Sequence, residues 1–244
     1  MKRIIFLTAI IAIFASCSNK AKTTIDEKPE VLQTTPYEKG MPVSIHFYKG
    51  DEYYHPLIVF WIEDAAGNYV ETLYATKSIA TGTFRYGVAD GKKWSEGERR
   101  RPAALPYWGH KRGFKAPDGL YIPSPENPLP DAITGATPTN NFVINSLINP
   151  EVKKFTIYME INQTWDWNQH WHNNLYPNDD EYKTSCQPAL VYRAEVDLTS
   201  TQKSFILKPI GHSHPSGKTG ELFTDLSTFT TALKIAGEVS FNIE

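Results

Sequence analysis

The sequence predicts a mostly-β protein, an antiparallel β-sandwich of the immunoglobulin-like kind, with long irregular loops and one short helix near the C-terminus. Several short segments alternate apolar and polar residues, as strands with one buried face do. Turn-forming residues separate these segments at the short spacing that is typical of sandwiches. One segment near the C-terminus has helical spacing instead.

Residues 1–16 predict a bacterial lipoprotein signal peptide. A positive start, MKR, precedes the apolar run IIFLTAIIAIFAS, which is too short for a membrane-spanning helix of about 20 residues and suits a secretory signal. The last residues, FASC, resemble a lipobox, so we expect acylation of Cys17 and a lipid anchor on the extracytoplasmic side of the bacterial cell envelope, in the periplasm or at the outer membrane. An ordinary cleaved signal peptide is the alternative.

Residues 17–40 are polar and nearly free of aromatic side chains, and we expect them to form a flexible tether. Residues 41–244 then form the β-sandwich domain, which is long enough to bury a core without disulfides. Beyond the expected lipidation site, Cys186 is the only cysteine, so no intrachain disulfide is available. We expect Cys186 to be a small buried residue.

The first strands of the domain are expected at residues 42–48, 56–64 and 69–76. The first alternates apolar and polar residues. The second is a dense apolar run, as expected for a strand buried on both faces. The turn DAAGN, in which Gly67 suits a positive φ, joins the second and third strands into a hairpin.

The C-terminal half is expected to add further strands, and the segments concerned are 155–161, 189–198, 204–210 and 238–244. The helix is expected within residues 225–235, with Asp225 or Ser227 as its N-cap. Two regions, 92–141 and 164–184, lack a strand pattern. Long irregular regions are usually functional or disordered, and the aromatic residues in both argue against disorder.

The composition is that of a globular protein, with 41% hydrophobic residues, 13% aromatic residues and a formal net charge of -2. This balance gives no electrostatic basis for binding nucleic acid. The sequence contains no nucleophile elbow, phosphate-binding loop or dinucleotide fingerprint. We therefore do not expect hydrolase chemistry.

The inserted region 92–141 ends in the stretch PLPDAITGATPTNN, residues 128–141. Gly135 gives its backbone the freedom to turn. Thr137 precedes Pro138, and a residue before proline is pushed into an extended conformation. Surrounding prolines stiffen the approach, so we expect a projecting loop that offers the Thr137 hydroxyl to solvent. A turn between two strands, in which the threonines bond to the backbone, is the alternative.

The run from Asp131 to Thr137 matches Asp-x-x-(Ser/Thr)-Gly-Ala-Thr. It resembles the signature at which bacterial flavin transferases attach FMN covalently to extracytoplasmic proteins, such as subunits of sodium-translocating and related electron-transport complexes. The resemblance implies a phosphoester bond between FMN and Thr137. The site residues that it implies are Asp131, Thr134, Gly135, Ala136, Thr137 and Thr139, the last at a position where the family often has a further Thr.

A second resemblance covers more of the chain. The segment PLIVFWIEDAAGNYVETLYAT, followed by RRRPAALPYW and DAITGATP, is similar to a bacterial family of predicted periplasmic lipoproteins built on a domain of unknown function. Annotations in that family borrow the name of a flagellar hook-assembly protein with an immunoglobulin-like fold. The resemblance implies the compartment and the sandwich, but no activity, because a fold does not determine a function.

The flavin-attachment resemblance implies an electron carrier more than an enzyme with its own substrate, because a flavin supplies the redox chemistry. The partners that follow are a flavin transferase, membrane redox proteins and the membrane itself. A basic aromatic segment, residues 97–115, offers cations for the FMN phosphate and Tyr107 and Trp108 for stacking. A solvated basic loop with packed aromatics is the alternative for this segment.

Two other functions remain open from the sequence. One is a non-enzymatic binding or assembly module of the cell envelope, with an immunoglobulin-like fold and no cofactor. The other is a metal-binding lipoprotein, because the pairs His170/His172 and His212/His214 would each present two imidazoles on one strand face.

Overall fold

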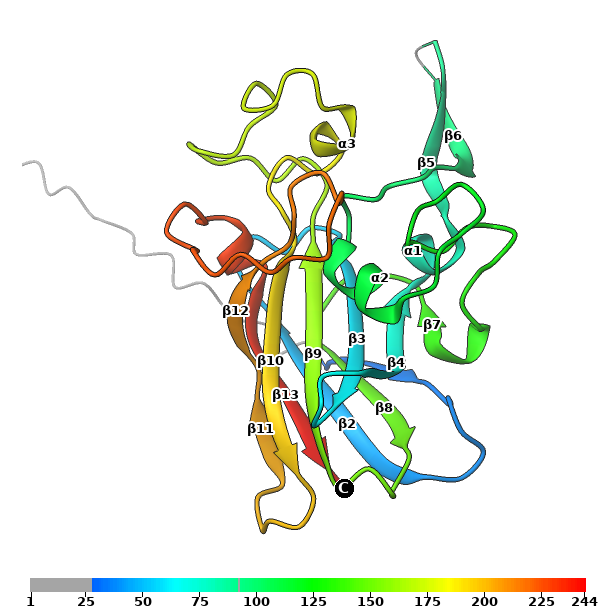
Figure 1. Ribbon diagram of the computed structural model, residues 1–244, viewed down its shortest axis with the longest axis vertical. Helices are drawn as coiled ribbons and strands as arrows, with labels where there is room; N and C mark the ends of the chain where they lie inside the picture. Colours follow the sequence, from blue (N-terminus) through cyan, green and yellow to red (C-terminus); the bar gives the residue numbers. More distant parts are fainter. Residues whose placement is uncertain (1–27, 92) are drawn as a thin grey trace, which may run out of the picture.

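Strands make up most of the regular secondary structure of the described chain, so the protein is mostly β, as the sequence predicts. The computed structural model describes residues 28–91 and 93–244. The expected signal peptide, residues 1–16, and the expected lipidation site, Cys17, lie outside the described residues. Figure 1 shows two large sheets facing each other, with most of the long loops gathered at one end.

The first large sheet has five strands, in the order β1 (Glu30–Gln33), β8 (Phe142–Ile148), β2 (Met41–Lys49), β13 (Ala236–Ile243) and β11 (Ser204–Ile206). The second has six, in the order β12 (Lys208–His212), β10 (Leu190–Asp197), β9 (Lys154–Asn162), β3 (Leu57–Asp64), β4 (Tyr69–Thr76) and β7 (Thr134–Gly135). A separate hairpin, β5 (Thr83–Asp90) and β6 (Lys93–Glu98), projects from the same end as the long loops (Figure 1).

The central strands pair antiparallel, as expected. Two pairs are parallel, β1 with β8 and β4 with β7. Each involves an outermost strand of its sheet, so the sheets as a whole are mixed and not purely antiparallel.

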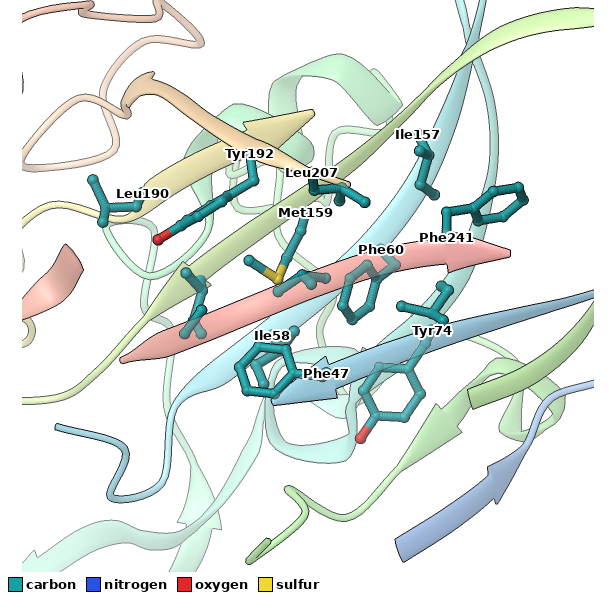
Figure 2. Packing of buried hydrophobic residues seen from close by; sticks show 14 of the residues in the cluster. Phe47, Ile58, Phe60, Tyr74, Ile157, Met159, Leu190, Tyr192, Leu207 and Phe241 are labelled. Atoms are coloured by element: carbon teal, nitrogen blue, oxygen red, sulfur yellow. The ribbon is translucent and has the colours of Figure 1, made fainter. Parts of the chain in front are cut away.

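The space between the two sheets is filled by the main hydrophobic core. Both sheets contribute to one continuous cluster, in which side chains such as Phe47 and Phe241 of the first sheet meet Phe60 and Met159 of the second (Figure 2). Alternate residues of β2, β3 and β9 point into this core, so the period-two pattern of the sequence reports the buried face correctly.

Strand β3 is buried on both faces, which confirms the expectation from its dense apolar run. Ile58, Phe60 and Ile62 belong to the main core. Val59 and Trp61 belong to a second cluster on the opposite face of the six-stranded sheet. That cluster is covered by α1 (Lys77–Thr81), α2 (Pro106–Arg112) and the loops beside them.

Helix α2 is held to the sheet by the carboxyl group of Glu160 in β9. The Leu105 side chain provides no cap, but Glu160 accepts a hydrogen bond from the backbone amide of Tyr107 at 3.2 Å and one from that of Trp108 at 2.8 Å. These amides lie in the first turn, where a helix leaves its N–H groups without partners. The helix ends at Gly113, whose positive φ suits glycine.

The structure corrects the expected helix near the C-terminus. Residues 225–235 contain only a 3-10 turn, η2 (Ala232–Lys234), and neither Asp225 nor Ser227 begins an α-helix. Asp225 instead accepts the backbone amide of Ser227 at 2.9 Å, a local turn that competes with a helical start.

The structure differs from the expectation at two further places. Strand β1 lies inside the expected tether, residues 17–40, because the backbone of Glu30–Gln33 finds hydrogen-bond partners along β8 and Leu32 packs against the core. The inserted region 92–141 contains β6 and α2. Part of this region covers the outer face of the six-stranded sheet, which explains its aromatic content. Region 164–184 is irregular apart from α3 (Asp180–Lys183).

Candidate functional site

The loop that carries the flavin-attachment pattern borders the six-stranded sheet. It begins with a 3-10 turn, η1 (Asp131–Ile133), in which the side chain of Ile133 is buried and anchors the loop. Two residues then form β7, where Thr134 pairs with Ala75 and Gly135 with Thr76. The following residues leave the sheet and cross to β8 in the other sheet.

Tyr74 of β4 holds the middle of this loop. Its hydroxyl donates a hydrogen bond to the carbonyl of Ala136 at 2.9 Å. The Tyr74 ring lies so close to Gly135 that a Cβ there would stand 3.0 Å from Cε2. Close packing against Tyr74 therefore favours glycine at position 135, since a Cβ there would require the Tyr74 ring to shift.

The Thr137 hydroxyl is half-buried at the protein surface. Its Oγ1 donates to the carbonyl of Pro56 at 3.4 Å, a long hydrogen bond. The following residue, Pro138, is buried, and its carbonyl accepts a hydrogen bond from Tyr53 at 2.8 Å. The backbone on the C-terminal side of Thr137 is thus fixed, while the Thr137 side chain is only weakly held.

Thr139 has a different environment. Glu30 of β1 accepts hydrogen bonds from the Thr139 amide at 2.7 Å, the Thr139 hydroxyl at 2.8 Å and the Asn140 amide at 2.9 Å. Burial alone would raise the pKa of Glu30, but these hydrogen bonds lower it below its usual range. The Thr139 hydroxyl therefore has a strong charged partner.

The remaining residues of the pattern lie in the same loop. Asp131 and Ala136 are exposed, and Thr134 and Gly135 are half-buried. The Asp131 carbonyl accepts a long hydrogen bond from the Thr134 hydroxyl at 3.4 Å. The residues of the pattern therefore form one local turn, and they make few side-chain hydrogen bonds with one another.

Sequence reasoning did not identify the residues that hold this loop, which are Glu30, Tyr53, Pro56 and Tyr74. Each is separated from its partner in the loop by 61 residues or more. None belongs to a motif. A glycine followed by small residues indicates that another part of the chain packs closely against it. The sequence does not identify the side chain that does so.

The basic aromatic segment 97–115 is not gathered around Thr137. Tyr107 and Trp108 are buried in the cluster on the outer face of the six-stranded sheet, so neither ring is free to stack on a flavin. Lys111 forms an ion pair with buried Glu63 at 3.1 Å, and Arg100 forms one with Asp118. The buried rings agree with the alternative of a basic loop with packed aromatics, but Lys111 and Arg100 are ion-paired and only partly exposed instead of fully solvated.

The four histidines do not form a ligand set. His212 is buried among the rings of Trp171, Phe223 and Phe229, and its Nδ1 lies 2.8 Å from the Ser213 carbonyl. The Nδ1 atoms of His172 and His214 each accept a nearby backbone amide, and His170 packs edge-on against Trp171. Within residues 28–91 and 93–244, no three His, Cys, Asp or Glu side chains lie where they could hold one metal ion.

In the part of the chain that the structure describes, no helix has the length and apolar character needed to cross a membrane. Comparison with protein-family models, with curated proteins and with solved structures gave no match to this chain.

Proposed function

We propose that this protein is a membrane-anchored extracytoplasmic lipoprotein that carries FMN covalently on Thr137 and transfers electrons between membrane redox proteins and extracytoplasmic partners. The observation that carries the proposal is the match of residues 131–137 to the flavin-attachment pattern, in a loop at the protein surface. The anchor would be the acylated Cys17, and a flavin transferase would be the modifying partner.

The local geometry favours Thr137 over Thr139 as the acceptor. A transferase must replace the hydroxyl proton of the acceptor by the FMN phosphoryl group of a flavin dinucleotide, whose nucleoside monophosphate leaves as the proton is released. The Thr137 hydroxyl gives up only a long hydrogen bond to a carbonyl. The Thr139 hydroxyl would give up a short one to the Glu30 carboxylate, and a phosphate there would lie beside that negative charge.

Lys77 offers a positive charge to the phosphate. It follows Thr76, which pairs with Gly135, and its side chain is exposed. It therefore lies beside the pattern, unlike the basic segment 97–115. A bound FMN supplies reversible one- and two-electron chemistry, and the chain contributes its position and its charge environment.

The two facing sheets support the finer proposal of an immunoglobulin-like sandwich. The central antiparallel strands and the shared core suit such a fold. In this arrangement the loops at one end of the sheets carry the function, as they do in other sandwiches.

The test is co-expression of the full chain with a flavin transferase, followed by a denaturing gel viewed for flavin fluorescence and by peptide mass spectrometry. We expect a fluorescent band and one FMN on the peptide that contains Thr137. Thr137→Ala should abolish labelling and Thr139→Ala should keep it. A wild-type band without flavin defeats the proposal, and labelling lost only in Thr139→Ala reassigns the acceptor.

A second candidate is a binding module without cofactor, and the β5–β6 hairpin favours it. The hairpin projects from the domain (Figure 1) and exposes Tyr86, Val88 and Trp94 by 60%, 45% and 50%. Exposed aromatic side chains on a projecting element are typical of contact surfaces. In this case Thr137→Ala would leave partner binding unchanged, whereas Trp94→Ala would weaken it.

A further inference from the structure

An unusual backbone conformation lies just beyond the end of β9. Trp165 has a φ of 57°, and Cys186, on the neighbouring segment, has a φ of 70°. These are the non-glycine residues with positive φ in the described chain. A bulky aromatic residue in this region is a true outlier, and such strain persists only where the surroundings impose it, often at functional sites.

The surroundings of Trp165 do impose this conformation. The next residue, Asp166, is buried and forms a β-bridge with Cys186. The indole N–H of Trp167 donates to the buried Cys186 sulfur at 2.9 Å. On the other side, the guanidinium of buried Arg101 donates to the Thr164 hydroxyl at 2.8 Å. Residues before and after Trp165 are therefore fixed.

The Trp165 side chain itself is free, because 61% of the residue is exposed. The fold thus holds a strained backbone under an exposed indole. The neighbouring contacts, and not packing of the side chain in the core, therefore impose the strain, and they fix the position of the ring at the surface.

Trp165 and Thr137 lie at the same end of the six-stranded sheet. Asn162, at the end of β9, pairs with Leu57 at the start of β3, and Gly135 pairs with Thr76 at the end of β4. The chain therefore leaves β9 and β7 at one end, where the loop that precedes β3 also lies.

That preceding loop connects the two sites and contributes a second ring. Thr137 Oγ1 contacts Pro56, and Tyr54, two residues earlier, donates its amide to the Gln163 side chain at 2.8 Å. Trp165 follows Gln163 by two residues, a step of at most about 7 Å. Tyr54 is 65% exposed. Two exposed aromatic residues therefore lie on segments that adjoin the contact of Thr137 with Pro56, at the same end of the sheet.

We propose that Tyr54 and Trp165 form a stacking surface for the isoalloxazine ring of the FMN attached to Thr137. This inference rests on the proposed function and names the residues that receive the ring. The flavin suits this surface because its attachment point, Thr137, contacts the loop that carries Tyr54. A planar flavin ring can stack on the face of an aromatic side chain. Tyr107 and Trp108, the stacking candidates from the sequence, are buried.

The test uses the full chain, matured with a flavin transferase, and measures the emission lifetimes of the bound flavin. Indole and phenol rings in contact with a flavin quench its emission, so the wild type should show a dominant short-lived component. Trp165→Asn removes the ring and suits the left-handed backbone. It should lower the ratio of quenched to unquenched flavin by about two- to tenfold, and Trp165→Tyr, which keeps an oxidisable aromatic ring, should restore part of it.

Tyr54→Leu provides a second variant in a segment without strain and should act in the same direction. Trp94→Asn removes another exposed indole, from β6, and should leave the flavin lifetimes unchanged. Mass spectrometry separates the two proposals. A chain without FMN overturns both, whereas a fully flavinylated chain whose lifetimes are the same in the wild type, Trp165→Asn and Tyr54→Leu overturns the stacking surface alone.

Discussion

The carboxylate of Glu30 accepts hydrogen bonds from both the amide and the hydroxyl of Thr139, at 2.7 Å and 2.8 Å, across 109 residues of chain. Glu30 is the first residue of β1, the strand that follows the N-terminal segment. The contact therefore joins the start of the folded domain to the loop that carries the flavin-attachment pattern. Thr137 lies two residues before Thr139. The contact between Glu30 and Thr139 therefore limits how far the loop moves when a transferase reaches the Thr137 hydroxyl.

Replacing Glu30 should loosen the loop without unfolding the domain. Glu30→Ala removes three hydrogen bonds to a charged acceptor at the surface, where water compensates in part, so we expect a loss of about 1 kcal/mol in unfolding free energy. Hydrogen exchange at the amides of Thr139 and Asn140 should become faster. Glu238→Ala, an exposed residue of β13, is the control. Unchanged exchange at both amides would show that Glu30 does not hold the loop.

The carboxyl of Glu160 should make stability depend on pH. Burial raises the pKa of Glu160 to about 8, although the amides of Trp108 and Tyr107 favour its charged form. In the unfolded chain the group loses its proton near pH 4.5, so between about 4.5 and about 8 the folded state binds more protons. Stability therefore falls as the pH rises through this window.

Glu160→Gln cannot ionise and should flatten this dependence, which thermal unfolding at a series of pH values would show. Glu160→Ala leaves the two helix amides without an acceptor and should cost about 3 kcal/mol at any pH in the window. Glu151→Gln, an exposed position, should leave the pH profile as in the wild type. An equally steep fall in Glu160→Gln would assign the dependence to other groups.

The sequence was sufficient for many of the regular strands, although β8 was not predicted and the segment 204–210, expected as one strand, is divided between β11 and β12 in different sheets. The predicted segments correspond to β2, β3, β4, β9 and β10, because alternation and dense apolar runs report burial directly. It was insufficient where a distant residue decides the local structure. Helix α2 takes its N-terminal acceptor from Glu160, more than 50 residues away. In residues 225–235 the pattern suits a helix, but Asp225 closes a tighter turn.

At the candidate site, too, the sequence predicts local features but not the contacts made by distant residues. The pattern from Asp131 to Thr137 located a surface loop and singled out Gly135. The pattern could not reveal the clamp by Glu30 or the ring of Tyr74, because both belong to strands without any motif of their own. Nor did the sequence separate Tyr107 and Trp108, which are buried, from Trp165, which is exposed.

Tyr74 and Gly135 should behave as one unit. Tyr74→Phe removes the hydrogen bond to the Ala136 carbonyl and should cost about 1 kcal/mol. Gly135→Ala places a methyl group against the Tyr74 ring and should displace it, which weakens the same hydrogen bond. The double variant should therefore lose less than the sum of the single losses in urea unfolding. Strict additivity would mean that the methyl group is accommodated elsewhere.

Arg101 should control the order of the segment that bears Trp165. The residue is only 6% exposed, and its guanidinium donates to the Thr164 hydroxyl at 2.8 Å, the Thr184 carbonyl at 2.9 Å and the Ser185 hydroxyl at 3.2 Å. It therefore holds both ends of an irregular segment that contains little regular structure. Burial lowers the pKa of Arg101 to about 10, which still leaves the group charged at neutral pH.

A lysine cannot reproduce this fork, because its ammonium is a single point of charge. Arg101→Lys should therefore cost about 2–3 kcal/mol in urea unfolding and should increase hydrogen exchange between Thr164 and Thr184 before it does so in β9 or β10. Arg99→Lys, at an exposed neighbouring position, keeps the charge and should leave both measurements unchanged. If exchange rises equally in the segment and in the two strands, Arg101 stabilises the whole domain and does not specifically order the Trp165 segment.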